Sequence, residues 1–473
     1  MITRTKKSPS PPPPSLTSLR SLTSSSLSSR RQWLQLGTLG VLGSWGLNAA
    51  TALAGSGKVL EGARAKSVIV LWLWGGPSHI DTFDLKPNAP IDYRGPYRPI
   101  ATRVPGIEIC ELLPELARRA DRYSLIRSLQ HTSNDHGVAG TIGITGTDTG
   151  AASLGGQTLP GQLKAAQGSI AAKLLESKGT WPAFVALGGH LHQGKQRIKG
   201  EGGGPIGAQF DPFRLDYDPE TGVRIPQLDL IDGLTSDRIK SRRELSHLLD
   251  GLTKNIERLV AVKQRDSIID QAYSLLSSGD ARKVFNIQSE TEETRERYGT
   301  HRFGQCCLLA RRLVETGVRF VQVNWSSHVE PIEDTGDGGW DTHDRHFCQF
   351  QDRHSWMLDQ TCSALLDDLA DRRLLDETIV LAIGEFGRTP KINPKAGRDH
   401  WNRCYSALVA GGGFKRGVIV GSSDPRAEVP TSSPMTPADL FMTVFDRLGI
   451  GTSRITTAGL TPLGHLVEEL CEG

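Results

Sequence analysis

The feature that most constrains the fold is a continuous apolar run at residues 66–74, with the sequence KSVIVLWLW. The run is rich in β-branched and aromatic residues, and Gly75-Gly76-Pro77 ends it abruptly. A strand that is apolar at every position, rather than at alternate ones, is typical of a parallel sheet buried on both faces. A chain with such a strand needs helices on both sides of its sheet.

Further segments alternate between short apolar runs and helical patterns. We predict additional strands at residues 123–127, 183–187, 318–324, 377–384, 406–410 and 417–421. We predict helices at residues 114–122, 138–144, 236–278, 292–316, 346–373 and 437–448. In the helix at 346–373, an apolar stripe is expected from Trp356, Leu358, Leu365, Leu366 and Leu369. This succession predicts an α/β fold, a three-layer sandwich with a mostly parallel central sheet.

The N-terminal segment has a different composition. Residues 8–30 are rich in Ser, Pro and Leu, which predicts disorder. Arg30-Arg31 then precede an aromatic residue, a Leu and a weakly apolar, glycine-broken run that ends in Ala52-Leu53-Ala54. This pattern is typical of a twin-arginine signal cleaved after Ala54, which predicts a periplasmic or extracellular protein. An uncleaved N-terminal anchor helix is the alternative.

The charge of the chain divides at the same place. The whole chain has 55 Lys+Arg and 52 Asp+Glu, but residues 1–54 contain six basic and no acidic side chains. The remainder therefore has a net charge of −3, which argues against a nucleic-acid partner. It also lacks a spanning apolar run, so no membrane span is expected after signal cleavage. We predict one domain at 55–473, with an irregular insertion at about 190–235 and a helical segment at about 236–316.

Polar residues that can bind metals collect after the predicted strands, where the chemistry of such sheets is usually located. Imidazole and carboxylate groups suit Zn²⁺, or Mn²⁺, Mg²⁺ or Ca²⁺ where oxygen ligands dominate. The predicted metal ligands are Asp81, Asp341, His343, Glu385, Asp399 and His400.

Each of these residues has a structural alternative. Asp81 could cap the turn after the first strand, and Asp135 could cap the following helix. His136 could be a buried, hydrogen-bonded histidine. Glu385 could form an ion pair with Arg388. The segments around Asp341 and Asp399 could be a solvated loop and a plain turn.

Five motifs together resemble a known family: GGPSHIDTFD, HTSNDHGVAGTIGITG, GWDTHDRHF, GEFGRTP and GRDHW. They resemble the exported bacterial proteins called domain of unknown function 1501, over about residues 66–470. That family is similar to the alkaline phosphatase and sulfatase superfamily. The resemblance implies an alkaline-phosphatase-like fold and hydrolysis of phosphate or sulfate esters with one or two divalent metals.

The resemblance can be carried over position by position. Gly75-Gly76 stand where the superfamily has an Asp after the first strand, and Asp81 is the nearest substitute. The superfamily's nucleophile corresponds to Thr132 or Ser133, and its Asp-x-x-x-His pair corresponds to Asp341 with His343 or His346. Its Asp-His pair corresponds to Glu385-Phe386, and its last histidine corresponds to His400. One histidine ligand is thus missing. No Cys or Ser fits the formylglycine pattern C/S-x-P-x-R.

The leading hypothesis is an exported metal-dependent hydrolase of phosphate or sulfate esters, sulfatase-like but without formylglycine. Thr132 or Ser133 would be the nucleophile and His136 or His79 the general acid or base. Arg388 or Arg398 would bind the anionic group of a small ester or of a sulfated or phosphorylated glycan.

Two non-enzymatic hypotheses remain open at this point. The first is a non-catalytic exported binding protein for a carbohydrate or the cell envelope. Its stacking surface would be formed by Trp72, Trp74, Trp340 and Trp401, which could equally be core residues. The second is a structural protein of the cell envelope.

Overall fold

A computed structural model describes residues 62–175, 181–218, 222–224, 279–325 and 339–472. Within this part of the chain the main sheet has nine strands, in the order β15-β4-β14-β11-β1-β10-β5-β8-β9. Along the chain they are β1 (Ser67–Leu73), β4 (Tyr123–Leu129), β5 (Phe184–Leu187), β8 (Phe213–Asp218), β9 (Gly222–Arg224), β10 (Phe320–Trp325), β11 (Thr378–Ile383), β14 (Tyr405–Ala410) and β15 (Ile419–Val420). Only β14 and β9 run against the others, so the predicted mostly parallel sheet is confirmed.

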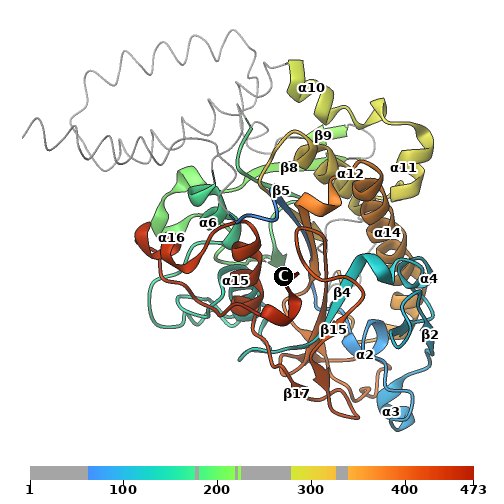
Figure 1. Cartoon of the computed structure of the whole chain (residues 1–473). Helices are drawn as coiled ribbons and strands as arrows, with labels where there is room; N and C mark the ends of the chain where they lie inside the picture. Colours follow the sequence, from blue (N-terminus) through green and yellow to red (C-terminus); the bar gives the residue numbers. More distant parts are fainter. Residues whose placement is uncertain (1–61, 176–180, 219–221, 225–278, 326–338, 473) are drawn as a thin grey trace, which may run out of the picture. The chain divides into compact units, whose positions relative to one another are not determined.

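Helices cover both faces of this sheet, as Figure 1 shows. Ile69, Leu71 and Leu73 of β1 join one apolar core, and Val68, Val70 and Trp72 join the other. The first face is covered by α4 (Pro114–Ala117), α10 (Gly279–Phe285), α11 (Glu292–Tyr298), α12 (Arg302–Glu315) and α14 (Ser355–Asp371). The second is covered by α5 (His136–Thr145), α6 (Gln167–Leu174), α15 (Pro437–Arg447) and α16 (Thr452–Thr457). The three-layer sandwich is confirmed, and burial on two faces explains why β1 is apolar throughout.

The segment predicted to be an irregular insertion contains an unexpected strand. β8 pairs with β5 in the main sheet, and Phe213, Leu215 and Tyr217 are buried. Charged residues stand between them, so the segment has the two-residue period of a strand. We predicted it to be irregular. A short hairpin of β6 (His192–Gln193) and β7 (Gln196–Arg197) precedes it.

Two predicted helices differ in detail. The helix expected at 292–316 is two helices, α11 and α12, separated at Gly299, which has φ = 88°. The helix expected at 346–373 consists of α13 (His346–Gln349), a π-helical turn (Phe350–His354) and α14. Its four leucines are buried as predicted, but Trp356 is 47% exposed. Two residues span about 200° of a helix, so Trp356 and Leu358 lie on different faces.

Small elements complete the described residues. They are α2 (His79–Thr82), α3 (Ile91–Arg94), and the pairs β2 (Pro99–Ala101) with β3 (Glu108–Cys110), β12 (Gly387–Arg388) with β13 (His400–Trp401), and β16 (Ser422–Ser423) with β17 (Pro430–Ser432). No helix in the described ranges combines the length and apolar content that a bilayer crossing requires. The predicted signal segment and the helix at 236–278 lie outside the described residues.

Candidate metal centre

The carboxyl edge of the sheet, where the parallel strands end, brings together segments that are distant in sequence. β1 leads into Gly75, β11 leads into Glu385, and α5 begins at His136. The loop before α13 supplies Asp341 and His343. The small β12–β13 pair supplies Arg388 and His400, which face each other in register. The sheet therefore places metal-binding side chains from four segments at one edge.

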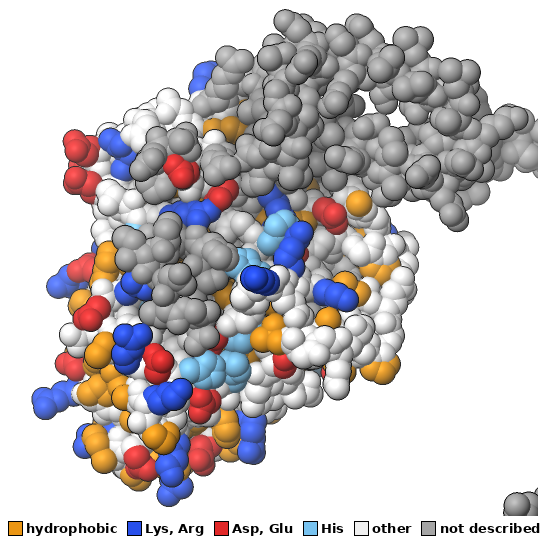
Figure 2. Space-filling model, turned by 180° about the vertical axis from the view of Figure 1, so that it is seen from behind, with side chains coloured by type: hydrophobic (Ala, Val, Ile, Leu, Met, Phe, Trp, Pro, Cys, Tyr) orange, Lys and Arg blue, Asp and Glu red, His pale blue; other side chains and the backbone are white. Residues whose placement is uncertain are grey.

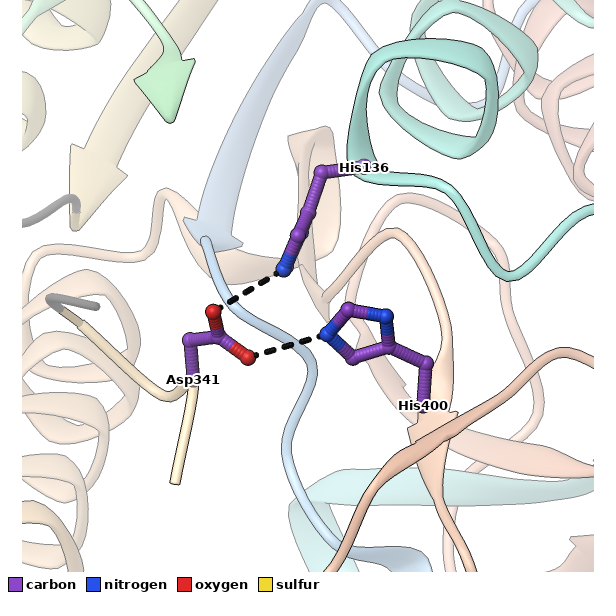
Figure 3. Close-up of side chains that lie close together, drawn as sticks. All are labelled: His136, Asp341 and His400. Carbon is purple, nitrogen blue, oxygen red and sulfur yellow. Dashed lines mark hydrogen bonds and ion pairs between the residues drawn. The ribbon is translucent and has the colours of Figure 1, made fainter. Parts of the chain in front are cut away.

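Asp341 is the centre of this arrangement, and three histidines point their Nε2 atoms at its carboxylate. His136 Nε2 lies 3.1 Å from Oδ2, and the Nε2 atoms of His343 and His400 each lie 3.1 Å from Oδ1. Figure 3 shows His136 and His400 approaching Asp341. The Nε2 atoms of His343 and His400 are 2.8 Å apart. We call Asp341, His136, His343 and His400 the Asp341 cluster.

The outer nitrogen of each histidine is already bound to an acceptor. Nδ1 of His136 lies 2.7 Å from Oε1 of Glu385, and Nδ1 of His343 lies 2.8 Å from Oδ1 of Asp399. Nδ1 of His400 lies 2.7 Å from the carbonyl oxygen of Asn134. Because an ionised carboxylate and a carbonyl only accept hydrogen bonds, each Nδ1 must carry the proton. In a neutral ring the Nε2 atom then carries a lone pair, which points toward Asp341 here, as it points toward the ion in metal-binding histidines.

This arrangement is incomplete as a set of hydrogen bonds. His136 is 1% exposed, and its Nε2 atom has no hydrogen-bond partner despite its proximity to Asp341. Lone pairs that converge on a buried carboxylate repel one another unless positive charge lies between them. Either protons or a cation must supply that charge. The ligand atoms of His136, Asp341 and His400 lie close enough together to hold one metal ion, and His343 lies beside them.

The electrostatics of the cluster follow from the same contacts. Burial would raise the pKa of Asp341, but Arg388 and the histidines outweigh burial and hold that pKa well below its usual value. Burial alone would lower the pKa of His136, but Asp341 and Glu385 raise it to about 9. Burial dominates at His400 and lowers its pKa. Asp341 is thus an ionised carboxylate at neutral pH, as a metal ligand has to be.

Arg388 and Gln193 fix the orientation of the Asp341 carboxylate. Nη2 of Arg388 donates to Oδ1 at 2.5 Å, and Nε2 of Gln193 donates to Oδ2 at 2.8 Å. The other nitrogens of Arg388 donate to backbone carbonyls, including those of Gly75 and Gly76. Arg388 is fully buried, so its guanidinium holds the loop around the site together.

Two glycines allow the segments to approach this closely. Gly75 has φ = 106°, and a Cβ atom there would lie 2.3 Å from the backbone nitrogen of Asp341. At Gly397 a Cβ atom would lie 1.8 Å from the carbonyl oxygen of His343. No side chain fits at either position without moving a loop that carries a cluster residue.

A second group of the same residue types lies nearby, around Asp81. Nη2 of Arg398 donates to its Oδ1 at 3.0 Å, and Nε of the same guanidinium forms an ion pair with Oδ2 at 2.6 Å. Ser78 Oγ donates to Oδ2 at 2.5 Å, and Nε2 of His346 lies 2.9 Å from Oδ2. Nδ1 of His346 in turn lies 2.6 Å from Oγ1 of Thr342. We call Asp81, Ser78, His346 and Arg398 the Asp81 cluster. Its carboxylate is fully buried and already faces a cation.

The predicted metal ligands thus divide into three groups. Asp341, His343 and His400 come together, and His136, which we predicted as an acid or base, joins them. Glu385 and Asp399 lie one layer behind, where they bind the outer nitrogens of His136 and His343. Asp81 belongs to the other cluster, because Arg398 and His346 occupy its oxygens.

The predicted catalytic residues lie less centrally. His79 is buried and its Nε2 atom contacts the carbonyl oxygen of Ala427, 2.8 Å away. Thr132 is exposed, and Oγ of Ser133 accepts from the backbone of Asp135. Asp135 caps α5, as its alternative interpretation proposed. The guanidinium of Arg388 donates to Asp341 and to backbone carbonyls.

Gln193 is the site residue that the sequence analysis missed. It lies on the β6–β7 hairpin, in the segment predicted to be irregular, and its Oε1 atom accepts from Nε1 of Trp74 at 3.0 Å. An isolated glutamine in a Gly-rich segment gives no signal of its own. Only its contacts with Asp341 and Trp74 identify it.

The site is open toward solvent on one side. The side chain of His343 is 32% exposed, and histidine side chains reach the surface among Lys and Arg on the face drawn in Figure 2. Beside it lies a groove of about 540 Å³ lined by Lys391, Asn393, Asp399, Trp401 and Glu428, among others. Trp72, Trp74 and Trp340 are buried in the core, so of the four predicted stacking residues Trp401 alone lines this groove.

Comparisons with known proteins give one family and several remote structures. A family model described as "Protein of unknown function (DUF1501)" matches residues 65–468. No curated protein matches the chain.

The similar solved structures include a sulfatase, a lipoteichoic acid synthase and a phosphonate monoester hydrolase. The PsFucS1 sulfatase from Pseudoalteromonas sp. is 12% identical, with 84% of this chain and 70% of that chain covered and a TM-score of 0.38. The lipoteichoic acid synthase LtaP from Listeria monocytogenes is 12% identical, with 88% and 80% covered and a TM-score of 0.36. The phosphonate monoester hydrolase of Agrobacterium radiobacter is 12% identical, with 85% and 77% covered and a TM-score of 0.33. Likenesses this weak support no inference about activity.

Proposed function

We propose that this chain, which belongs to the family of proteins of unknown function called DUF1501, is an exported, metal-dependent hydrolase of phosphate or sulfate esters. The observation that supports the proposal best is the convergence of three Nε2 atoms on the buried carboxylate of Asp341. Each histidine has its outer nitrogen fixed, so the three Nε2 atoms are oriented before any ion binds.

A divalent cation held by the Asp341 cluster would act as a Lewis acid toward an ester and would lower the pKa of a water molecule. The chain's own contribution is a rigid set of ligands. Arg388 and Gln193 keep the carboxylate of Asp341 oriented, and Glu385 keeps the ring of His136 oriented.

Water is the nucleophile that this geometry favours. In the described part of the chain, no side-chain hydroxyl forms a hydrogen bond with a residue of the Asp341 cluster. Thr132 has no polar contact with the cluster, and Oγ of Ser133 is bound to the backbone of Asp135. We therefore propose a water molecule, rather than Thr132 or Ser133, as the attacking group.

The substrate we propose is an anionic ester, either a small molecule or a sulfated or phosphorylated glycan. Arg388 and Arg398 are both committed to internal contacts, so the negative charge of the ester would face the cation itself. Trp401 and Lys391 line the adjacent groove and offer an aromatic surface and a positive charge for the rest of the molecule.

Export is proposed from the sequence of residues 1–54. The twin arginines Arg30-Arg31 and the small residues before Ala54 are the basis for a periplasmic or extracellular location. A fusion of residues 1–60 to a reporter should be exported, and an Arg30→Lys/Arg31→Lys fusion should remain in the cytoplasm. Export of the double variant at an unchanged level would overturn this part of the proposal.

The activity is tested with the purified full chain and aryl phosphates and aryl sulfates, with Zn²⁺, Mn²⁺, Ca²⁺ or Mg²⁺ added in turn. We expect turnover of one ester class that is abolished by a chelator and by the double variant Asp341→Ala/His343→Ala. The matched control is Asp371→Ala/His465→Ala, which removes the same residue types from exposed positions. No bound metal together with no turnover of either ester class would overturn the enzyme proposal.

A second candidate, a non-catalytic carbohydrate-binding protein, is favoured by the groove beside Trp401. It predicts quenching of tryptophan fluorescence by an unesterified oligosaccharide, lost in Trp401→Ala, in a protein that shows no turnover. Turnover in the assay above would decide for the hydrolase.

A further inference from the structure

The donor atoms of the Asp341 cluster define a class of metal. Three imidazole nitrogens and one carboxylate converge within a space where the nearest donors are about 3 Å apart. Zn²⁺ and other borderline ions take four ligands of this kind, whereas Mg²⁺ and Ca²⁺ require six or more oxygen ligands. The donor set therefore favours a borderline ion over Mg²⁺ or Ca²⁺.

His343 is held as firmly as the three more buried members, although its side chain is partly exposed. Its Nδ1 atom binds Asp399, and Nδ2 of Asn393 donates to its carbonyl oxygen at 2.8 Å. Gly397 packs directly against that carbonyl. These contacts fix both the backbone and the ring, with Nε2 directed at Asp341 and His400. Such positioning is expected of a fourth ligand and is unnecessary for a surface histidine.

The neighbouring carboxylate of Asp81, by contrast, meets a guanidinium with both of its oxygens. The guanidinium of Arg398 meets Asp81 through two nitrogens, and its remaining donors go to backbone carbonyls of Thr389, Pro390 and Tyr93. Arg398 and Asp81 are both fully buried. A divalent ion at Asp81 would face this guanidinium at both carboxylate oxygens without solvent to screen the like charges, whereas Arg388 meets only Oδ1 of Asp341.

We infer that the protein binds a single borderline divalent cation through His136, Asp341, His343 and His400, and that Arg398 takes the place of a second cation at Asp81. This inference rests on the metal dependence in the proposed function and adds the number, the class and the fourth ligand of the ion. The positive charge at Asp81 then comes from the Arg398 side chain, and the bound ion adds positive charge at Asp341.

The test uses the full chain, freed of metal by a chelator and titrated with Zn²⁺ and Co²⁺ alone. We expect one equivalent by calorimetry and by elemental analysis after gel filtration. Co²⁺ should give the intense visible absorption of a four-coordinate ion. Mg²⁺ and Ca²⁺ at the same concentrations should give no saturable binding.

Variants assign the ligands. His343→Ala should lower the Zn²⁺ affinity more than about 100-fold, since even the outer partners of metal ligands account for about 10- to 100-fold. His346→Gln and the exposed His465→Ala should retain one equivalent and an affinity within about threefold of the original. Circular dichroism before titration shows which variants are folded, and His465→Ala stands in if His346→Gln is not.

The outcomes separate the inference from the proposed function. Two equivalents, or an unchanged affinity in His343→Ala, would overturn the inference and leave a metal-dependent hydrolase standing. Absence of any saturable metal binding would overturn both.

Discussion

The two buried clusters at the carboxyl edge contain the same residue types and differ in where their positive charge comes from. Around Asp81, the guanidinium of Arg398 meets both carboxylate oxygens. Around Asp341, the guanidinium of Arg388 meets Oδ1 alone, Gln193 donates to Oδ2, and three imidazole nitrogens lie 3.1 Å from the carboxylate. A buried carboxylate beside a histidine is thus structural in one place and a candidate ligand in the other. The difference lies in the hydrogen-bond partners and not in the composition.

The clusters also touch, so a change in one can be compared with a change in the other. Thr342 follows Asp341 in the chain and contacts His346 of the Asp81 cluster. Nη1 of Arg388 donates to the carbonyl oxygen of Arg398 at 3.1 Å. Variants at matching positions in the two clusters can therefore test whether this distinction holds.

The largest effect is expected from Arg398→Met, which leaves the buried Asp81 carboxylate without its cation. Breaking a buried ion pair in this way should lower the free energy of unfolding by about 3–5 kcal/mol, measured by urea denaturation. Added Zn²⁺ should not restore the loss. Arg345→Met, at an exposed position, is the control and should change stability by less than about 0.5 kcal/mol. Restoration of Arg398→Met by Zn²⁺ would show that Asp81 can accept a metal after all.

The same substitution should show a characteristic pH dependence. Burial would raise the pKa of Asp81, but Arg398 and His346 lower it below the usual value of 3.8. Asp81 therefore stabilises the original protein above that value and loses this contribution as the pH falls further. In Arg398→Met the unpaired carboxyl would take up a proton more readily. The stability difference between the two proteins should shrink as the pH falls from 7 to about 4.

A smaller loss, about 2–3 kcal/mol, is expected from Arg388→Met in the metal-free protein. The substitution removes a charged hydrogen bond to Asp341 and donors to the carbonyls of Gly75 and Gly76. Because a bound cation can still neutralise Asp341, saturating Zn²⁺ should recover part of the loss. An equal loss with and without Zn²⁺ would remove the distinction between the clusters.

Glu385→Gln tests the layer behind the ligands. Glu385 accepts from Nδ1 of His136 and from the backbone nitrogen of Gly75. Loss of its charge should weaken Zn²⁺ binding about 10- to 100-fold without changing the stoichiometry. Calorimetric titration gives both quantities, and a change in stoichiometry would make Glu385 a ligand itself.

A weaker effect of the same kind is expected from Asp399→Asn. Asp399 holds Nδ1 of His343, but its side chain is 54% exposed, so solvent can replace part of the interaction. We expect a reduction in Zn²⁺ affinity of about tenfold, at the lower end of the range for such partners. A larger loss than in Glu385→Gln would mean that His343 depends on its partner more than His136 does.

The smallest effect is expected from Thr132→Ala and Ser133→Ala. If water is the nucleophile, kcat with the ester substrate should stay within about twofold of the original, as for other surface substitutions. The absence of a hydrogen bond between either hydroxyl and the Asp341 cluster is the reason. A loss of several orders of magnitude in one variant would identify that hydroxyl as the nucleophile.

The architecture and the edge of the sheet that carries the candidate site could be predicted from the sequence. The strand β1 is almost entirely apolar because it is buried on both faces of the sheet. Burial on both faces can therefore be predicted from the local sequence pattern. The edge at which the parallel strands end follows from the order of strands and helices. Asp341, His343 and His400 could therefore be assigned to one place before their contacts were known.

Which polar residues face one another follows from the tertiary structure alone. Arg398 reaches Asp81 across 317 positions of the chain, and Glu385 reaches His136 across 249. The glycines at 75 and 397 decide how closely the loops approach. No local pattern encodes such distances, since a carboxylate has the same sequence signal whether a guanidinium, an imidazole or a metal faces it. Asp81, Glu385 and Asp399 were therefore predicted as metal ligands together with Asp341, and the folded chain places them outside the Asp341 cluster.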